Sequence, residues 1–533
     1  MIYSEQIQSH IRQHKWDYCV LVLWSVISLA MLFYHEPWRD EVRAWILARE
    51  LTLFQVVNAM QYDAHPILWY IWLKAFVGFP LPIGLPLASW LFCLPAAALW
   101  VFKTPFRTWF RLLFLFTAPM LYWYPVVSRN YALMLPLLCA IAILYPKRAE
   151  HPFWYGLFVA LLANTHIVAE GVVLALFIFD LFSLYRSSSS IPFQRRRLLI
   201  APAITLLGVL AAFLTTFRSL TNSDWTKNNV VKQIWIRGQC LEFARNFIGF
   251  KDLSFFQLLP SLLLAVFVLG YLYFLLRKPS FRHRGTMLGV AFASIILLVT
   301  IVLAIVHCKN WWLLPIFPFA VFLCIYPDCD WRHAIGVMLS MGWVLLLVFG
   351  YVPFLPQRAY LLPLYAVFFA WITYKQNHAD SLSAFTLHCT PLLLLMLVCS
   401  ASDIYCDWKY RFSDLGHCAD YIQQHISASQ QMSIVYLDAS SPHLFAYTRR
   451  PIRIYQYGIE ILYDPGNLKK TYASQPFEEV LPVILQSHDI LIFEKKAKEN
   501  FAKFFIQQYG YTPIYESPDT VLTDDTFIIL LPP

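Results

Sequence analysis

Long apolar segments recur along residues 17–400 and constrain the fold more than any other feature of the sequence. The segments 17–34, 198–217, 255–276 and 287–306 reach or approach the ~20 residues that a helix rising ~1.5 Å per residue needs to cross ~30 Å of hydrocarbon. Apolar residues make up 59% of the chain and charged residues 14%, whereas about a quarter of a soluble domain is charged. The sequence therefore predicts an integral membrane protein with many transmembrane helices.

The net charge of +9 reflects basic residues in short loops between the apolar segments. Loops retained in the cytoplasm are enriched in Lys and Arg, so the charge indicates topology rather than nucleic-acid binding. No small-residue cleavage site follows the first apolar run, so this run is predicted to remain as the first helix, with the N-terminus in the cytoplasm. The basic loops are 103–111, 147–150, 186–197 and 277–284.

These loops share one side only if segment 65–79 does not cross the bilayer, so we expect this segment to be interfacial or re-entrant. About thirteen transmembrane helices then remain, and an odd number places the two ends of the chain on opposite faces. The predicted spans are 17–34, 84–102, 112–130, 131–146, 153–170, 171–185, 198–217, 255–276, 287–306, 312–326, 334–352, 359–374 and 384–400.

From Asp403 onward the sequence is mixed and polar, and it follows a span that leads outward. We therefore expect a transmembrane domain at 1–401, with a first outer loop at 35–83, and a small α/β domain at 402–533 outside the cytoplasm. The elements predicted in the smaller domain are buried strands at 432–439 and 488–495 and amphipathic helices at 413–426 and 498–510.

The first outer loop carries three carboxylates soon after a membrane span. Read as a helix from about Asp40, it has an amphipathic face, as expected for a helix in the headgroup plane. Asp40 and Glu41 point about 100° apart, so one would act in catalysis while the other supports it. The alternative is that Glu36, Asp40 and Arg43 form a charge ladder on a solvated face.

Two further polar groups lie at outer ends of predicted helices. His65 offers a titratable imidazole before Pro66, which favours a helix start, and a hydrogen-bonded surface histidine is the alternative reading. Arg129, near Tyr131, needs a partner at its depth in the membrane. It could pair with a carboxylate of the first loop, bind a phosphate, or extend to the headgroups.

Ionisable residues also gather at later outer helix ends. His166 and Glu170 bring an imidazole and a carboxylate to this face, and a structural i, i+4 pair between them is the alternative. Lys309 and Arg358 each open an apolar, Pro-containing span and suit an anionic lipid headgroup. Either could instead be an interfacial anchor.

Taken in chain order, these residues resemble the pattern of the GT-C glycosyltransferases. The similarity is to the family 39-like group that uses polyprenyl-phosphate sugars and includes the protein O-mannosyltransferases and the lipid A aminoarabinose transferase. It covers the whole layout, including a C-terminal domain outside the cytoplasm. The matching elements are Asp40-Glu41 after the first span, His65-Pro66 later in that loop, Arg129 with Tyr131, Ala132 and Leu133 at a span end, and Thr165-His166 at an outer helix end.

The resemblance implies an inverting sugar transfer from a polyprenyl-phosphate donor to a hydroxyl or phosphate group of a lipid, glycan or protein acceptor. Asp40 would take the acceptor's proton, and Glu41 and His65 would shape the acceptor site. Family members act in the bacterial inner membrane with a periplasmic site, so the resemblance implies that localisation. The cations that would offset the charge of the departing lipid phosphate are Lys309, Arg358 and Arg129.

No cofactor is expected. Ser128 stands where some relatives have an acidic residue, which argues against a required metal. The eleven cysteines are scattered, many of them inside apolar spans, and form no CxxC pair. They therefore indicate neither a disulfide framework nor a zinc site.

A transporter or flippase of lipid-linked sugars is the main alternative function. Transport places ionisable groups near span centres, whereas here, apart from Lys74 in segment 65–79, they gather at the outer ends of spans. A structural membrane subunit would explain the C-terminal domain but leave the carboxylates of the first loop without a role. The position of the charges therefore favours the enzyme.

Overall fold

The computed structural model describes residues 14–60, 65–186, 192–222, 331–350, 356–374 and, with short gaps, 382–533. The chain forms two compact units. A helical unit comprises Met1–Ala30, Ala64–Leu68 and Ser89–Ile404, and a sheet unit comprises Met31–Asp63, Trp69–Ala88 and Tyr405–Pro533. The first outer loop is thus mostly in the same unit as the C-terminal part of the chain.

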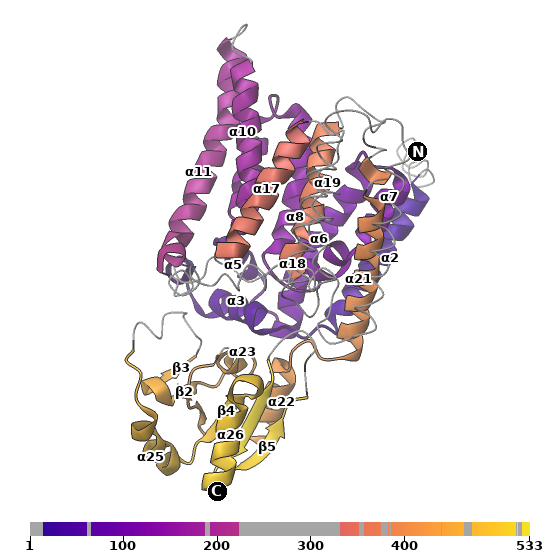
Figure 1. Ribbon diagram of the computed structural model, residues 1–533. Coiled ribbons are helices and arrows are strands. Elements are labelled where there is room, and N and C mark those ends of the chain that lie inside the picture. The colour runs from indigo at the N-terminus through magenta and orange to yellow at the C-terminus, as the bar shows by residue number, and fades with distance from the viewer. Residues whose placement is uncertain are drawn as a thin grey trace, which may run out of the picture. The chain divides into compact units, whose positions relative to one another are not determined.

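Apolar helices build the helical unit (Figure 1). Within the described residues, four helices are long and apolar enough to cross a membrane: Lys15–Leu32, Leu81–Lys103, Ile167–Tyr185 and Arg197–Thr216. The predicted spans 255–276, 287–306 and 312–326 lie outside the described residues. The helices lying wholly or mainly in this unit are α2 (Lys15–Leu32), α6 (Leu81–Lys103), α7 (Thr108–Leu115), α8 (Tyr131–Leu144), α9 (Pro152–Ala163), α10 (Glu170–Arg186), α11 (Pro192–Asn222), α17 (Trp331–Gly350), α18 (Pro356–Ala359), α19 (Leu361–Tyr374) and α21 (Thr390–Lys409), with the short turns η1 (Pro119–Trp123), η2 (Tyr145–Lys147) and η3 (Ile167–Ala169).

The prediction of one continuous span at 112–130 was wrong. Helix α7 ends at Leu115, and a π-helical turn, η1, follows it. Pro119 has no N–H to donate to the preceding turn, so an α-helix cannot continue through it without losing a hydrogen bond. The backbone N–H of Tyr124 donates instead to the carbonyl of Pro119, 3.2 Å away, which is the wider spacing of a π turn.

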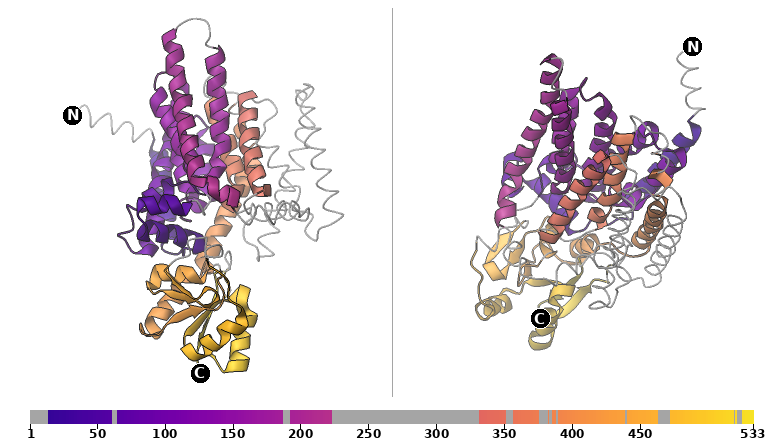
Figure 2. Two further views of the ribbon diagram at one scale, coloured as in Figure 1. Left: turned by 90° about the vertical axis from the view of Figure 1, so that its left-hand side faces the viewer. Right: turned by 45° about the horizontal axis from the view of Figure 1, so that its top comes forward.

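Small residues let neighbouring helices approach closely, as is common between membrane helices. In α11, a Cβ at Gly208 would lie 2.6 Å from the Cα of Ala160 in α9. In α10, a Cβ at Gly171 would lie 2.8 Å from the Cα of Ser340 in α17. Helix α10 therefore packs against α17, and α11 against α9, with backbone in contact (Figure 2).

The sheet unit contains a six-stranded sheet in the order β3-β2-β1-β4-β6-β5. Strand β1 pairs in parallel with both β2 and β4, and the outer pairings are antiparallel. Two predicted strands and two predicted helices of the tail correspond to β1, β4, α22 and α26. The elements of the tail are α22 (Leu415–His425), β1 (Met432–Ile434), η6 (Ser441–Leu444), α23 (Phe445–Thr448), β2 (Ile452–Ile454), η7 (Tyr455–Tyr457), β3 (Ile459–Ile461), α25 (Phe477–Ser487), β4 (Ile490–Glu494), α26 (Lys495–Tyr509), β5 (Thr512–Glu516) and β6 (Phe527–Leu531).

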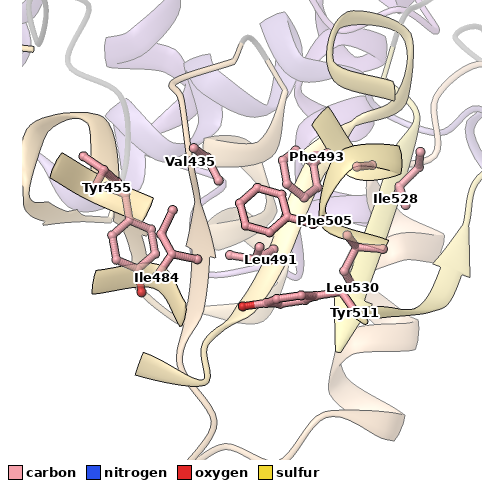
Figure 3. Packing of buried hydrophobic residues seen from close by; sticks show 11 residues of the cluster. Val435, Tyr455, Ile484, Leu491, Phe493, Phe505, Tyr511, Ile528 and Leu530 are labelled. Carbon is pink, nitrogen blue, oxygen red and sulfur yellow. The ribbon is translucent and has the colours of Figure 1, made fainter. Parts of the chain in front are cut away.

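One face of this sheet packs against α25 and α26 (Figure 3). Leu491 and Phe493 of β4 contribute to this core, together with Ile484 of α25 and Phe505 of α26. Successive residues of a strand point to opposite faces, and Ile492 is fully buried as well, so the other face is also covered. Strand β4 is therefore apolar on both sides along Leu491–Phe493, as a strand between two layers requires.

The first outer loop folds into three short helices, α3 (Arg39–Glu50), α4 (Leu53–Met60) and α5 (Leu68–Leu73). Helix α5 has 6 residues, too few to span a bilayer. The apolar side of α3 carries Val42, Trp45 and Ile46, all at most 1% exposed. This side is covered by protein, whereas the sequence predicted that it would face the membrane surface.

Candidate functional site

Five of the predicted binding residues meet in the helical unit, and we call them the His65 cluster: His65, Arg129, Tyr131, His166 and Arg358. Nε2 of His65 lies 3.3 Å from a guanidinium nitrogen of Arg129. The His166 ring is 4.9 Å from the His65 ring and 4.6 Å from the Tyr131 ring. Arg358 donates from Nε to the Tyr131 hydroxyl at 3.0 Å. Four distant chain segments thus contribute to one site.

Helix ends position these side chains. Arg129 and Tyr131 lie at the start of α8, where Asn130 donates from its amide nitrogen to the carbonyl of Thr165 at 2.9 Å. This bond joins the beginning of α8 to the segment after α9. His166 is the N-cap of η3, and its Nδ1 accepts a hydrogen bond from the Val168 N–H at 3.2 Å.

The hydrogen bond from the Val168 N–H determines the tautomer of a neutral His166. A neutral imidazole that accepts at one nitrogen carries its hydrogen on the other. Nε2 of His166 is buried and has no hydrogen-bond partner among the described residues. His166 therefore presents an N–H that a ligand oxygen can accept.

The His65 cluster is buried and cationic. Arg129 is 7% exposed and Arg358 is 4% exposed. Two guanidinium groups removed from water favour an anion that can accept several charge-assisted hydrogen bonds, and the planar guanidinium matches a phosphate well. The i, i+4 pair of His166 and Glu170, the alternative reading of these residues, does not form, because His166 precedes the helix that begins at Glu170.

An apolar cavity of about 530 Å³ adjoins the cluster in sequence and in space. Pro66 and Ile167, the neighbours of His65 and His166, line it, and α10, α11 and α17 provide most of its wall. Among the described residues that line it, Glu170 is the one ionisable residue. Pockets of this size with a few polar groups at one end commonly hold a small molecule. The lining residues are Pro66, Ile167, Glu170, Val173, Leu174, Phe177, Thr205, Leu206, Val209, Ala212, Phe213, Thr216, Trp343 and Leu347.

The two carboxylates predicted as catalytic lie in different surroundings within the sheet unit. The Glu41 side chain is fully buried; it accepts a hydrogen bond from the Trp38 N–H at 3.1 Å and contacts Nε2 of His35 at 3.0 Å. The Asp40 side chain is 37% exposed and lies 3.9 Å from Nε of Arg39. Asp40 is therefore the carboxylate that a substrate can reach.

The sequence also allowed a charge ladder of Glu36, Asp40 and Arg43, but Glu36 pairs with a different residue. Glu36 precedes α3, and its carboxylate contacts Nδ1 of His417 at 2.8 Å. Lys309 lies outside the described residues. Among the residues that the structure describes, no group of three or more His, Cys, Asp or Glu side chains could hold a metal ion.

Sequence reasoning missed His35 and Asp407. Nδ1 of His35 lies 3.0 Å from the Asp407 carboxylate, 372 positions away in the chain. No periodicity or spacing links residues so far apart. The only local signal was the place of His35 immediately before the acidic loop.

Apolar helices, a buried cationic cluster and an apolar cavity together define a polytopic helical membrane protein with a site suited to an amphiphilic anion. No protein-family model and no curated protein matches the chain.

Solved structures of ArnT from Cupriavidus metallidurans are similar to it. The structure bound to undecaprenyl phosphate is 12% identical, covers 97% of this chain and 98% of its own, and has a TM-score of 0.45. The apo structure is 14% identical, covers 96% and 97%, and has a TM-score of 0.43. ArnT is a member of the group to which the sequence resemblance points. At these identities and TM-scores, the similarity to ArnT supports no residue role, and the proposals below rest on the chain's own residues.

Proposed function

We propose that the protein is an inverting glycosyltransferase that moves a sugar from a polyprenyl-phosphate donor to a hydroxyl or phosphate group of a lipid, glycan or protein acceptor. One observation carries this proposal: the largely buried, cationic His65 cluster adjoins a mainly apolar cavity. A long isoprenoid phosphate has the same division into an anionic head and an apolar tail.

In this proposal the phosphate binds at the His65 cluster. Arg129 and Arg358 supply guanidinium donors, and His166 supplies its Nε2–H. The isoprenoid chain occupies the cavity along α10, α11 and α17, where burial of apolar surface stabilises it. Glu170 marks the cavity end next to the cluster, and Lys309 is proposed as a further cation for the phosphate.

Asp40 is the proposed general base. It takes the proton from the acceptor group, whose oxygen attacks the anomeric carbon from the face opposite the phosphate. The bond between that carbon and the phosphate oxygen breaks, and the lipid phosphate leaves with the electron pair. The guanidinium groups offset the charge that develops on the leaving oxygen. Glu41, being buried, does not touch the substrate and has a positioning role.

The proposed topology follows the basic loops of the sequence. About thirteen spans would place the N-terminus in the cytoplasm and the C-terminal domain, residues 402–533, in the periplasm of a bacterium with the enzyme in its inner membrane. The transmembrane domain would comprise residues 1–401. Labelling of single cysteines introduced at Asn164 and Glu499 from either side of the membrane tests this arrangement.

The activity is tested with purified protein and polyprenyl-phosphate sugars, with released lipid phosphate as the product measured. We expect Asp40→Asn to lower kcat by about 10²-fold or more, because the base is lost. Glu50→Gln, a carboxylate at the other end of the same helix, is the matched control and should keep full activity. Unchanged transfer by Asp40→Asn would end the assignment of Asp40 as base. A flippase would move the lipid-linked sugar across liposomes without releasing lipid phosphate.

The donor site is tested by binding of polyprenyl phosphate. Arg358→Lys removes the planar donor that contacts Tyr131, and we expect Kd to rise roughly tenfold, as for the loss of a hydrogen bond to a charged group. Arg148→Lys is the control, since this guanidinium pairs with Asp180 and makes no contact with the cluster. Equal affinity in both variants would place the phosphate elsewhere.

A further inference from the structure

His35 lies between two buried carboxylates in the sheet unit. Its Nε2 contacts Glu41 of α3 and its Nδ1 contacts Asp407 of α21, both at 3.0 Å, and all three side chains are 0% exposed. A neutral imidazole can donate only one hydrogen bond, which would leave its other nitrogen facing a carboxylate without a hydrogen between them. With both carboxylates ionised, only the imidazolium satisfies both contacts, and the trio then consists of one cation and two anions.

The first turn of α3, which carries Asp40, is attached to this trio. Glu41 accepts a hydrogen bond from the Trp38 N–H, which belongs to the N-cap of the helix. The next N–H, that of Arg39, donates to the buried carboxylate of Asp525 at 3.0 Å. Both neighbours of Asp40 in sequence are therefore fixed by residues that contact the C-terminal part of the chain.

The rest of the first outer loop is held in the same way. Glu36 accepts from the N–H groups of Gly416 and His417, the first turn of α22, where a carboxylate is favoured by the helix dipole. Farther along α3, Arg49 donates to the carbonyl of Ala446 in α23 at 2.9 Å. Within the loop itself, Lys74 donates to the carbonyl of Ala48 at 2.9 Å, which joins the residue after α5 to the end of α3.

The elements that contact α3, η6 and α23, follow the carboxyl end of strand β1. Strand β1 runs parallel to both neighbours, and the chain leaves its carboxyl end to form η6 and α23, which contact α3. In open α/β sheets, ligands bind outside the carboxyl ends of parallel strands where the connections diverge. Here a helix of the same chain occupies that position.

We propose that the C-terminal domain holds the helix that carries the catalytic base, and that His35 is a positioning residue that orients Asp40 through Glu41 and Asp407. This inference rests on the proposed function for the role of Asp40. Its structural part, that the charged His35 fixes the first turn of α3, stands on the contacts alone.

A pH dependence follows from the neighbours of His35. Burial lowers the pKa of His35, but the charges of Glu41 and Asp407 outweigh burial and raise this pKa to about 10. Other groups near the trio include the Phe412 ring, edge-on to His35 at 4.5 Å, and Tyr447, which lies near Glu41. Because neither of these is charged at neutral pH, Asp407→Asn removes one of the two charges that keep the imidazole protonated.

The test compares pH profiles of sugar transfer. For Asp407→Asn we expect the alkaline limb of kcat to move to lower pH by about one unit or more, because the pKa of His35 falls. For His35→Gln we expect kcat to drop roughly tenfold or more, with an unchanged KM for the polyprenyl-phosphate sugar. The control is Asp489→Asn, which removes another buried carboxylate of the C-terminal domain, bonded to Ser433 and Tyr455 rather than to α3. It should lower the thermal stability and leave the alkaline limb in place.

A second measurement does not depend on the activity. Hydrogen exchange of the full-length protein reports protection of the backbone amides in the first turn of α3. We expect His35→Gln to lose this protection and Asp407→Asn to lose it at a lower pH than the wild type, while Asp489→Asn keeps it. An alkaline limb and a protection profile that do not change in Asp407→Asn would overturn the proposal. If the protection changes as expected but the protein shows no transferase activity, the proposed function is refuted, whereas the role of His35 in fixing the first turn of α3 stands.

Discussion

At the scale of single residues, burial separates two carboxylates that are adjacent in the sequence. Asp40 and Glu41 have the same chemistry, yet Glu41 is enclosed by His35 and the N-cap of α3, while Asp40 is partly exposed. Removing the partner of a buried charged group destabilises the fold, whereas an accessible carboxylate can exchange protons with a substrate.

This difference predicts stability effects of different size. Glu41→Ala should lower the free energy of unfolding by roughly 1–3 kcal/mol, because it leaves one buried nitrogen of His35 and the Trp38 N–H without an acceptor while Asp407 still pairs with His35. Asp40→Ala should change it by about 0.5 kcal/mol or less, as is usual for a surface substitution. Thermal unfolding of both variants in detergent measures the two effects. A stable Glu41→Ala protein with wild-type melting would contradict the assignment of Glu41 to a structural role.

At the scale of elements, proline and glycine determine where helices of the helical unit end and how closely they pack, which hydropathy alone does not. Pro119 ends the helical segment that hydropathy alone extends to residue 130, and Gly208 allows α11 to touch α9. Both effects are steric. They determine where a helix stops and how near its neighbour lies, while the apolar composition determines only that it is a helix in a membrane.

Close approach predicts that α11 does not tolerate a larger residue at Gly208. A Cβ there would meet the Cα of Ala160 at 2.6 Å, so Gly208→Ala should cost about 1–3 kcal/mol through overpacking. Gly342→Ala in α17 is the matched control, because nothing lies within 4 Å of its Cβ position. The midpoint of thermal unfolding should fall for the first variant and stay or rise for the second.

At the scale of the whole molecule, the chain passes between the two units several times. The segments Met31–Asp63 and Trp69–Ala88 belong to the unit that contains Tyr405–Pro533, so the C-terminal domain is not an independent appendage. This division explains how residues 372 positions apart, His35 and Asp407, form one buried group.

The trio around His35 predicts that stability falls at high pH. Burial lowers the pKa of His35, but the charges of Glu41 and Asp407 raise it from the ordinary histidine value of 6.5 to about 10 in the folded protein. The folded state thus binds this proton more tightly, and the stabilisation is complete below pH 6.5 and is lost as pH rises toward about 10. Melting temperatures recorded across that range should converge for the wild type and His35→Gln. A constant difference between the two proteins would show that the proton on His35 does not contribute.

The sequence by itself determined the class of the protein and the place of its polar groups. Hydropathy is a property of composition, so it indicated a membrane protein before the fold was known. The rule that charges avoid hydrocarbon placed four of the polar residues at helix ends. These are His65, Arg129, His166 and Arg358. The apolar run at 488–495 and the amphipathic spacing at 413–426 likewise located β4 and α22 in the tail.

Only the tertiary structure decided which residues meet. The His65 cluster joins four segments that no sequence period connects, and the choice between Asp40 and Glu41 depended on His35 and Asp407. Burial and pairing are set by residues distant in the chain, whereas hydropathy and helical periodicity are local. For that reason the kinds of side chain at the site were predictable, and their partners were not.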